Sequence, residues 1–369
     1  MKRYLFTYGE LNAGGAERVL LDILNNFNYQ ENEVDLLQIN AGGVLLDELP
    51  KEVNVIKAWN GYPPSYKFAL RSSLWLGCQL PLRRRLKAAL QGKHYDVGIS
   101  FLEGMPLKCH SLITDVADRN YSWVHCDLNE FRYCSHLFRN NEELQAYNKM
   151  TAVISVSNDT SQAFLKRFPQ CISQQKVIYN PIDHNKILRK AEEGRVTNNH
   201  FTIAICGRLT PPKKIERALR LARAMKDYGT DFKVQLIGTG ELEGEMKELT
   251  TSLDINDVVE FVGFVRNPYP HIKAADMLLS TSCAEGFSLV ICEAMVLGVP
   301  VVSTMTSGPM EILDNNRYGL LCCHDDDSIY NAVMELYNDA ALRKHYAEVG
   351  RQRVLMFSID NTLKEIYKL

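Results

Sequence analysis

Apolar positions in the first half of the chain form short runs separated by segments with helical spacing. The short runs predict β-strands at residues 3–8, 34–40, 53–58, 96–101, 121–125 and 152–157. One apolar stripe at helical spacing follows the first run, and it consists of Ala16, Val19, Leu20, Ile23 and Leu24. Asn158 or Asp159 is expected to cap a later helix that runs towards Phe168.

The second half repeats this alternation. It predicts strands at residues 201–206, 233–237, 259–262, 277–280 and 300–303, and helices at 215–228, 242–253 and 289–297. Strands that alternate with helices in this way are typical of parallel sheets covered by helices on both faces.

A polar segment at residues 190–200, with Gly194 and two asparagines, has no apolar periodicity and is interpreted as a link. The fold class is therefore α/β, with two Rossmann-like domains at residues 1–188 and 189–349. The last stretch is helical, and its final part, about residues 350–369, is expected either to stay with the second domain or to pack back on the first.

Composition narrows the possible classes of protein. A chain of 369 residues with 46% hydrophobic content can form two cores, and a net charge of −2 gives no indication of a nucleic-acid partner. The ten cysteines contain no C-x-x-C pair and favour reduced thiols in a cytoplasmic protein. The first apolar run is too short for a signal peptide, and no run is long enough to span a bilayer, so any membrane contact is expected to be peripheral.

Gly14 and Gly15 stand between the first predicted strand and the first helix. Glycines at this position let the backbone approach a ligand, and a helix N-terminus favours an anion. An ordinary tight turn explains the pair equally well.

A basic loop, which contains Arg208 and Lys213, follows the predicted strand at 201–206. Open α/β sheets bind ligands at the carboxyl ends of their strands, and an arginine there can grip phosphate oxygens through its planar fork. The alternative is a solvated basic loop, but the position after a buried strand favours a function.

Two glutamates, Glu285 and Glu293, flank the start of the helix predicted at 289–297. Backbone N–H groups at the start of that helix suit a diphosphate. Glu293 lies on an otherwise apolar face, where it needs hydrogen-bond donors such as ribose or sugar hydroxyls. Two surface carboxylates are the alternative interpretation.

Two weaker features remain. His125 ends the strand predicted at 121–125, where it is either a structural hydrogen-bonding residue or part of a site. Residues 67–91 mix apolar side chains with Arg83, Arg84 and Arg85, which suits an interfacial helix on an anionic membrane or a solvated basic face over a normal core.

Taken together, these segments resemble the family-four retaining glycosyltransferases, which have the GT-B fold. The resemblance rests on GGAER at 14–18, VISVSN, YNPID, GRLTPPKK at 207–214, LIGTGEL, VEFVGF, the two glutamates at 285 and 293 with the following GVP, and GPMEI at 308–312. It covers nearly the whole chain and is stronger in the second half. It implies that the two domains face each other across a deep cleft.

The resemblance also implies roles for individual residues. Arg208 and Lys213 would bind the donor diphosphate, Glu285 the donor sugar and Glu293 the ribose, while His125 would lie beside the reacting sugar carbon. The remaining contacts would come from Gly14 and Gly15 at the diphosphate, from Gly263, Phe264 and Val265 at the base, and from the backbone of Phe287, Ser288 and Leu289.

One position departs from the family pattern. Lys214 stands where the family usually has a glycine, which leaves the choice between Lys213 and Lys214 open. The mechanism implied is retention, with the leaving group stabilised by cations and a helix N-terminus rather than by a metal. Asp325, Asp326 and Asp327 are expected to cap a helix rather than to bind a metal.

The resulting hypothesis is a glycosyltransferase that takes a hexose or N-acetylhexosamine from a UDP-sugar. The acceptor would be a lipid-linked or surface glycan, such as a lipopolysaccharide O-antigen, capsule or exopolysaccharide unit. The arginines at 83–85 would bring the enzyme to the cytoplasmic face of the inner membrane. The alternatives are an epimerase or phosphorylase with the same fold, or a non-catalytic nucleotide-sugar-binding scaffold.

Overall fold

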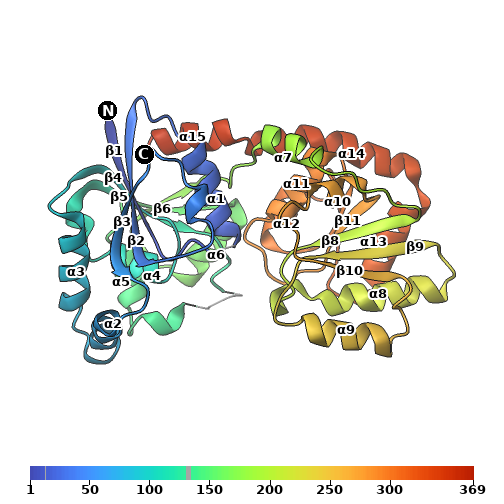
Figure 1. The fold of residues 1–369 in the computed structure, drawn as a ribbon, viewed down its shortest axis with the longest axis horizontal. Coiled ribbons are helices and arrows are strands. Elements are labelled where there is room, and N and C mark those ends of the chain that lie inside the picture. Colours follow the sequence, from blue (N-terminus) through green and yellow to red (C-terminus); the bar gives the residue numbers. More distant parts are fainter. Residues whose placement is uncertain (13, 130–133) are drawn as a thin grey trace. The chain divides into compact units, whose positions relative to one another are not determined.

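The computed structural model describes residues 1–12, 14–129 and 134–369, and they form two compact units, each built on a parallel sheet (Figure 1). The first unit contains residues 1–181 and 359–369, and the second contains residues 182–358. The division at 181/182 precedes α7 (His184–Ala191), because this helix packs on helices of the second unit. The polar segment of the sequence predicts this boundary after residue 188.

The described residues of the first unit form a seven-stranded sheet in the order β3-β2-β1-β4-β5-β6-β7. Every neighbouring pair is parallel, which confirms the predicted fold class. The strands are β1 (Lys2–Tyr8), β2 (Asn32–Ala41), β3 (Asn54–Asn60), β4 (Tyr95–Ser100), β5 (Ala117–Val124), β6 (Ala152–Ser155) and β7 (Gln174–Val177).

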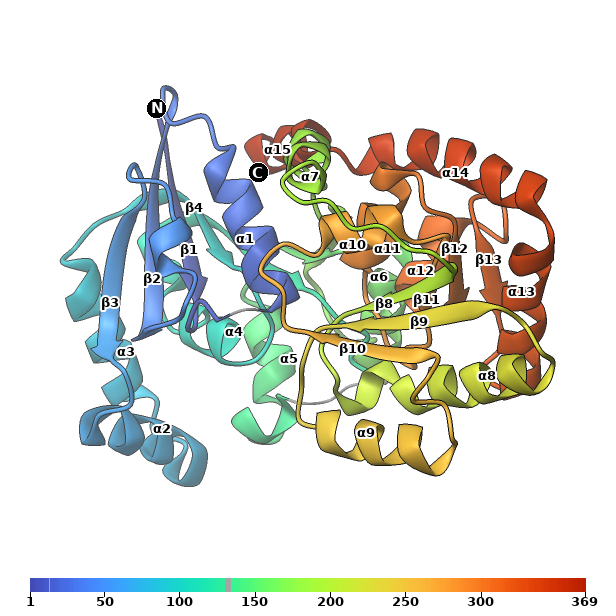
Figure 2. The same cartoon turned by 45° about the vertical axis from the view of Figure 1, so that its right-hand side comes forward.

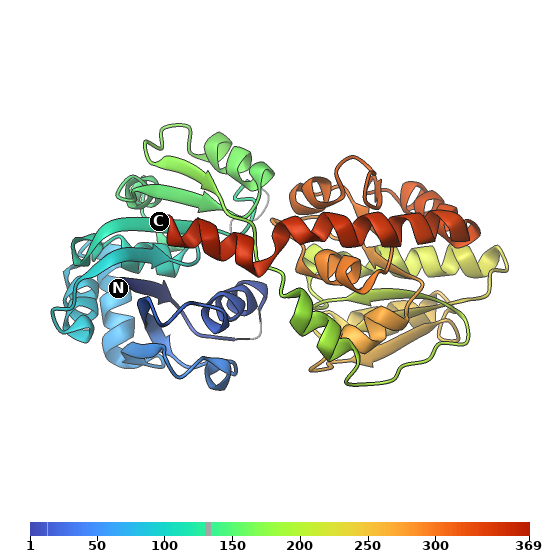
Figure 3. The ribbon, with the colours of Figure 1, turned by 90° about the horizontal axis from the view of Figure 1, so that it is seen from above.

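Helices cover both faces of this sheet. They are α1 (Gly15–Asn25), α2 (Pro64–Leu76), α3 (Leu80–Leu90), α4 (Met105–His110), α5 (Glu142–Tyr147), α6 (Asn158–Arg167) and α15 (Ile359–Tyr367). Buried residues of α2, α3 and α4 share one core with β1 and β2. The chain's last helix, α15, belongs to this unit: Lys2 Nζ donates to the Tyr367 carbonyl at 2.9 Å, and the Tyr121 hydroxyl donates to the Leu369 carbonyl at 3.1 Å (Figure 3).

The second unit repeats the strand order with six strands among the described residues, β10-β9-β8-β11-β12-β13. They are β8 (Phe201–Cys206), β9 (Phe232–Ile237), β10 (Val259–Gly263), β11 (Met277–Ser280), β12 (Val301–Thr304) and β13 (Leu320–Cys322). The order reverses between β8 and β11, and the same reversal lies between β1 and β4 of the first unit. Ligands of doubly wound sheets bind outside the carboxyl ends of the strands at such a switch point.

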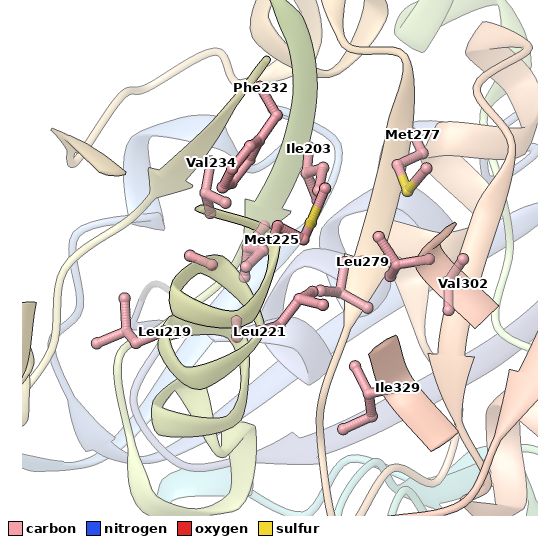
Figure 4. Packing of buried hydrophobic residues seen from close by; sticks show 14 of the residues in the cluster. Ile203, Leu219, Leu221, Met225, Phe232, Val234, Met277, Leu279, Val302 and Ile329 are labelled. Carbon is pink, nitrogen blue, oxygen red and sulfur yellow. The ribbon is translucent and has the colours of Figure 1, made fainter. Parts of the chain in front are cut away.

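Helices also cover both faces of the second sheet (Figure 2). Besides α7 they are α8 (Ile215–Asp227), α9 (Glu243–Ser252), α10 (Tyr269–Ala274), α11 (Leu289–Leu297), α12 (Ser307–Leu313), α13 (Asp326–Asn338) and α14 (Ala340–Val354). One core lies between the sheet and α8, α9 and α13, where Ile203, Met225, Leu279 and Ile329 are fully buried or nearly so (Figure 4). This packing holds the carboxyl ends of the strands in place, and the loops that follow those strands start from there.

Most predicted elements are confirmed, and the cap of one helix differs. Ser157, rather than Asn158 or Asp159, caps α6, because its hydroxyl accepts a hydrogen bond from the Thr160 N–H at 3.1 Å. The aspartate run does cap a helix, since the Asp325 carboxylate accepts from the Ser328 N–H at 2.8 Å. Across the described residues, no helix is long and apolar enough to cross a membrane.

Candidate functional site

A pocket opens at the switch point of the second sheet, beside the carboxyl ends of β8 and β11. It is lined by Ile205, Cys206, Gly207, Arg208, Lys213, Ile215, Leu279, Ser280, Thr281, Ser282 and Val290. The two predicted cations, Arg208 and Lys213, therefore lie on one pocket with the first turn of α11. Arg208 is exposed, whereas Lys213 is half-buried.

Lys213 forms an ion pair with Glu285, whose side chain is only 14% exposed. Glu285 Oε1 also accepts a hydrogen bond from the Ser282 hydroxyl at 2.9 Å. The pair is positioned by the backbone, since the Cys283 N–H donates to the Pro212 carbonyl at 2.8 Å and the Thr281 hydroxyl donates to the Lys213 carbonyl at 2.9 Å. The structure thus joins three of the predicted site residues in one place.

Lys214 has a different environment from Lys213. Its backbone is left-handed, with φ of 51°, which is the conformation that a glycine adopts without strain. Its ammonium lies 3.6 Å from Glu216 Oε1, in the first turn of α8. Of the two lysines left open by the sequence, Lys213 is the one that lines the pocket.

The loops after β8, β9 and β10 are tied together by their backbones. The Gly207 N–H donates to the Ile237 carbonyl at 2.9 Å, and the Gly238 N–H donates to the Gly263 carbonyl at 2.8 Å. A Cβ on Gly238 would lie 2.0 Å from the Gly207 carbonyl oxygen, so this close approach requires a glycine. The exposed ring of Phe264 follows directly, and Val265 is half-buried in the same loop.

Glu293 is half-buried on α11 and lies outside the lining of the pocket. It stands three residues after Val290, which does line the pocket, so both side chains share a face of the helix. The Tyr269 hydroxyl donates a hydrogen bond to Glu293 Oε1 at 3.0 Å. Tyr269 was not predicted as a site residue, because only the fold brings α10 beside α11.

The segment from Phe287 to Leu289 leads into α11. Ser288 occupies the N-cap position, and its side chain makes no capping hydrogen bond. Behind this segment the Gly308 N–H donates to the Glu285 carbonyl at 2.9 Å, and a Cβ on Gly308 would lie 2.7 Å from the Phe287 Cα. Gly308 therefore sets the path of the chain at the start of the helix.

The first unit has a polar cluster at the carboxyl ends of β4 and β5. Glu103 is 2% exposed, and its carboxylate accepts hydrogen bonds from the His125 N–H at 3.0 Å and from the Cys126 thiol at 3.1 Å. Burial, together with the Glu103 charge, raises the pKa of the Cys126 thiol far above its ordinary value. Glu103 was not predicted, because a single glutamate belongs to no sequence pattern.

His125 presents a buried ring nitrogen to this cluster. Among the described residues its Nε2 has no hydrogen-bond partner. Burial lowers the pKa of His125 to about 4, against the opposing effects of the Glu103 carboxylate and of a hydrogen bond with the Phe101 backbone. The imidazole is therefore neutral at neutral pH and leaves one nitrogen available to a ligand.

Gly14 and Gly15 lie where the sequence analysis places them. Gly14 is the N-cap of α1 with extended backbone, and Gly15 is the first residue of the helix. A Cβ on Gly14 would lie 2.2 Å from a carboxylate oxygen of Glu17. A side chain at residue 14 would thus meet the acidic residue of the first helical turn.

The three arginines predicted to face a membrane are all exposed but differ in their contacts, and their membrane role stays a prediction. Arg83 Nη2 lies 3.3 Å from Asp115 Oδ2, and Arg85 Nε donates to the Ala58 carbonyl. Only Arg84, of the three, has no partner among the described residues. In the described ranges, no group of three His, Cys, Asp or Glu side chains is arranged to hold a metal ion.

Residues 188–353 match the family model described as glycosyl transferases group 1. A Campylobacter jejuni relative is the N-acetylgalactosamine-N,N'-diacetylbacillosaminyl-diphospho-undecaprenol 4-alpha-N-acetylgalactosaminyltransferase, which is 29% identical over 57% of either chain. A second protein of that organism, the GalNAc-alpha-(1->4)-GalNAc-alpha-(1->3)-diNAcBac-PP-undecaprenol alpha-1,4-N-acetyl-D-galactosaminyltransferase, is 25% identical over all of this chain and 98% of its own length.

A solved structure, Anabaena HepE in complex with UDP, has a similar fold. The TM-score is 0.75 with 21% identical residues, and the match covers all of this chain and 99% of the other. This similarity confirms the expected fold of two Rossmann-like units.

Proposed function

Because residues 188–353 match the family model of the group 1 glycosyl transferases, we propose that this chain transfers a hexose or N-acetylhexosamine from a UDP-sugar to a lipid-linked or surface glycan. The observation that carries the donor assignment is the grouping of Arg208, Lys213 and Glu285 at the switch point between β8 and β11. UDP in the HepE structure and the undecaprenol-linked substrates named for the Campylobacter relatives support this choice of donor and acceptor.

Arg208 and Lys213 would bind the diphosphate of the donor. Arg208 supplies a planar fork to phosphate oxygens, and Lys213 supplies a compact charge. The ion pair with Glu285 holds Lys213 in place before the donor arrives. When the bond between the sugar and the diphosphate breaks, negative charge grows on the leaving group, and fixed cations stabilise that charge without reorganising.

Further contacts to the donor would come from the loops around this pocket. Glu293, oriented by Tyr269, would accept hydrogen bonds from the ribose hydroxyls. The backbone of residues 263–265 would meet the base, and backbone N–H groups of residues 287–289 would face the sugar and the phosphates. Glu285, beside Lys213, would accept a hydrogen bond from a sugar hydroxyl.

The first unit would contribute His125 and the glycines at residues 14 and 15. The neutral imidazole of His125 has an unpartnered, buried Nε2, which is suited to a sugar hydroxyl near the reacting carbon. The N-terminus of α1 at Gly14 and Gly15 would add a backbone contact to the diphosphate.

Retention would follow if the acceptor hydroxyl attacks from the face that the diphosphate leaves. This reaction uses the protein's own cations, and we propose that it proceeds without a metal cofactor. A cytoplasmic location is part of the same proposal. It is compatible with the ten cysteines, all of them described and none in a disulfide, as is usual in a reducing compartment.

The test begins with donor binding by the purified chain. We expect UDP and one or more UDP-sugars to raise its melting temperature, and one UDP-sugar to release UDP slowly by hydrolysis when no acceptor is present. Arg208→Ala and Glu293→Ala should weaken UDP binding about tenfold or more, since each removes hydrogen bonds of a charged group. Arg195→Ala, which changes an exposed arginine outside the pocket, is the matched control.

His125→Ala should behave differently from the two binding variants. It should lower turnover while UDP affinity stays within about twofold, because its proposed contact is to the sugar and not to the nucleotide. Product stereochemistry, read from the anomeric coupling constant, tests retention. UDP binding without turnover for any sugar would favour a non-catalytic binding protein, and no binding of any nucleotide would refute the donor assignment.

A further inference from the structure

We propose that the outward face of α2, together with the turn into α3, is a docking surface for a bilayer of anionic lipids. This α2–α3 surface consists of Phe68, Arg71, Trp75, Leu76 and Leu80. This docking role is separate from glycosyl transfer, and it can be tested independently of that function. Helices α2 and α3 lie beside each other, and α3 packs on β3 at the edge of the first sheet (Figure 2).

Large apolar side chains are exposed on this surface. The exposed fractions are 66% for Phe68, 71% for Trp75, 78% for Leu76 and 49% for Leu80. Phe68, Arg71 and Trp75 follow one another at spacings of three and four residues, so they share one face of α2. Contiguous exposed apolar residues of this size mark an interaction surface on a folded protein.

The inward face of α2 makes this exposure more informative. It buries Tyr66 and Ala69 together with two serines, Ser72 and Ser73, of which Ser73 is fully buried. A helix that only needed to cover its own core would bury the phenylalanine and tryptophan and expose the serines. In α2 the arrangement is reversed, because the larger apolar residues face outwards.

The charged residues within the segment that forms this surface all have one sign. The segment from residue 61 to residue 92 contains six lysines and arginines and no aspartate or glutamate. The Arg71 guanidinium lies 5.5 Å from the centre of the Trp75 ring, and Arg84 is exposed without a partner in the described part of the chain. Basic residues beside aromatic and aliphatic ones fit the headgroup and acyl layers of an anionic membrane.

Contacts behind the surface hold it in shape. Gln79, in the turn between the two helices, donates to Glu142 Oε1, which also pairs with the almost fully buried Lys108 at 2.8 Å. Gly77 closes α2 in the left-handed conformation, with φ of 70°. The turn that carries Leu76 and Leu80 is therefore tied to α4 and α5, so apolar side chains are presented without a need for refolding.

A second copy of this chain is a less suitable occupant. Two such surfaces face to face would bring two sets of uncompensated positive charges together, which opposes association. An anionic bilayer instead offers negative charge at its surface and apolar chains below, so that Arg71 and Arg84 remain at the headgroups while Trp75 and Leu76 insert.

The tryptophans of this chain give a direct measurement. It has three, and Trp59 and Trp123 are almost fully buried, so Trp75 is the one that can respond to solvent. With vesicles of phosphatidylcholine and phosphatidylglycerol, we expect the full chain to sediment and its tryptophan emission to shift to the blue. Pure phosphatidylcholine vesicles, or high salt, should reduce binding by about tenfold or more.

Variants separate the two parts of the surface. Phe68→Ser with Trp75→Ser should abolish sedimentation, whereas Ile172→Ser with Tyr228→Ser, at exposed apolar sites elsewhere, should not change it. Arg71→Glu with Arg84→Glu should reduce binding about tenfold or more, and the charge-matched control Arg195→Glu with Lys344→Glu should have little effect.

The proposal is overturned if anionic vesicles leave the emission of Trp75 unchanged and do not sediment the protein. It is equally overturned if the Phe68 and Trp75 variant binds vesicles as well as its control does. Dimerisation in solution that is lost in that same variant would assign the surface to a second copy of the chain instead. Circular dichroism of each variant checks that it is folded.

Discussion

Lys214 has a backbone conformation that costs a non-glycine residue free energy. At its φ of 51°, the Cβ lies too close to the backbone, and this conformation costs about 1 kcal/mol or more relative to glycine. We expect Lys214→Gly to raise the free energy of unfolding by about 0.5–1 kcal/mol, since part of the gain is offset by the greater freedom of glycine in the unfolded chain. Urea unfolding followed by circular dichroism measures it.

The control for this prediction is Lys214→Ala. It removes the same charge and the contact with Glu216 but keeps the Cβ, so it should give no such gain. UDP affinity should change little in both variants, because Lys213 is the lysine that lines the pocket. A loss of UDP affinity as large as that of Arg208→Ala would show that Lys214 also binds the phosphates.

Tyr269 is expected to act on the nucleotide through Glu293. Its hydroxyl donates to Glu293 Oε1, so Tyr269→Phe leaves the carboxylate with one fixed contact fewer and a less defined orientation. We predict that UDP binds about three- to tenfold more weakly in Tyr269→Phe, which corresponds to about 1 kcal/mol for one hydrogen bond. Calorimetric titration measures the change.

The exposed Tyr228 offers the matched comparison for that substitution, because Tyr228→Phe removes a hydroxyl from the same unit away from the pocket. Unchanged UDP affinity in Tyr269→Phe would mean that Glu293 is oriented by other contacts, or that it does not bind the ribose.

Single residues could be predicted from the sequence where they belong to a pattern. Arg208, Lys213 and Glu285, which the structure brings together, could be proposed because each follows a clear strand or precedes a clear helix. Glu103 and Tyr269 were not found, since each becomes notable only when the fold brings it to His125 or to Glu293. Ser157 rather than Asn158 is the helix cap because its backbone is extended and its hydroxyl accepts from the Thr160 N–H, and composition indicates neither feature.

At the scale of elements, Gly308 connects α12 with the chain that enters α11. A Cβ at this position would lie 2.7 Å from the Phe287 Cα, so Gly308→Ala must displace backbone rather than a flexible side chain. We expect this substitution to weaken UDP-sugar binding about tenfold, because the N–H groups at the start of α11 would move away from the donor. Titration with UDP-sugar and with UDP alone measures the effect.

Gly244→Ala serves as the comparison, because a Cβ there meets no atom within 4 Å. If Gly308→Ala bound the donor as tightly as this control, the start of α11 would not be a donor contact. A fall in stability alone, with donor affinity kept, would give Gly308 a purely structural role.

Several elements with continuous buried apolar runs were predicted with the correct bounds, and two of the edge strands were missed. Strands β8 and β11 and helix α11 coincide with their predictions, because continuous apolar runs define them. Strand β7, with the sequence QQKV, and the three-residue β13 were missed. Each lies at the edge of its sheet, where one neighbour suffices and the apolar signal is weak.

For the whole molecule, the alternation of strands and helices predicts two doubly wound units, and the structure confirms them. The sequence left open where the last helix belongs. The structure assigns α15 to the first unit through contacts of Tyr367 and Leu369 with residues near the N-terminus and in β5. Contacts between residues so distant in sequence leave no local pattern, which is why the sequence alone could not decide.

The first unit is expected to lose stability in mild acid because of His110. This residue is fully buried between α4 and the sheet, where its Nδ1 lies 2.9 Å from the Thr7 hydroxyl and its Nε2 lies 3.0 Å from Asn120 Oδ1. Burial lowers the pKa of His110 to about 4, although the contact with Asn120 opposes the shift. The imidazole is therefore neutral in the folded protein well below the pH at which it would be protonated in the unfolded chain.

The sign of the pH effect follows from this difference. Between the ordinary histidine pKa of about 6.5 and the folded value of about 4, the unfolded chain binds the proton and the folded chain does not. The contribution of His110 to the free energy of unfolding is thus fully present above about pH 6.5 and falls as the pH is lowered towards 4. At about pH 5, His110 alone accounts for a loss of about 2 kcal/mol.

Tryptophan fluorescence can measure this loss in the first unit, because all three tryptophans, at residues 59, 75 and 123, belong to it. The urea midpoint read in this way should fall between about pH 7 and pH 5. His110→Gln should have a lower free energy of unfolding than the parent at about pH 7. Between about pH 7 and pH 5, its free energy of unfolding should fall by about 2 kcal/mol less than that of the parent. His94→Gln, at an exposed site in the same unit, should keep the parental slope. Equal slopes in all three proteins would mean that burial of His110 does not govern the acid response, and the remaining candidate would be His125, whose pKa burial also lowers to about 4.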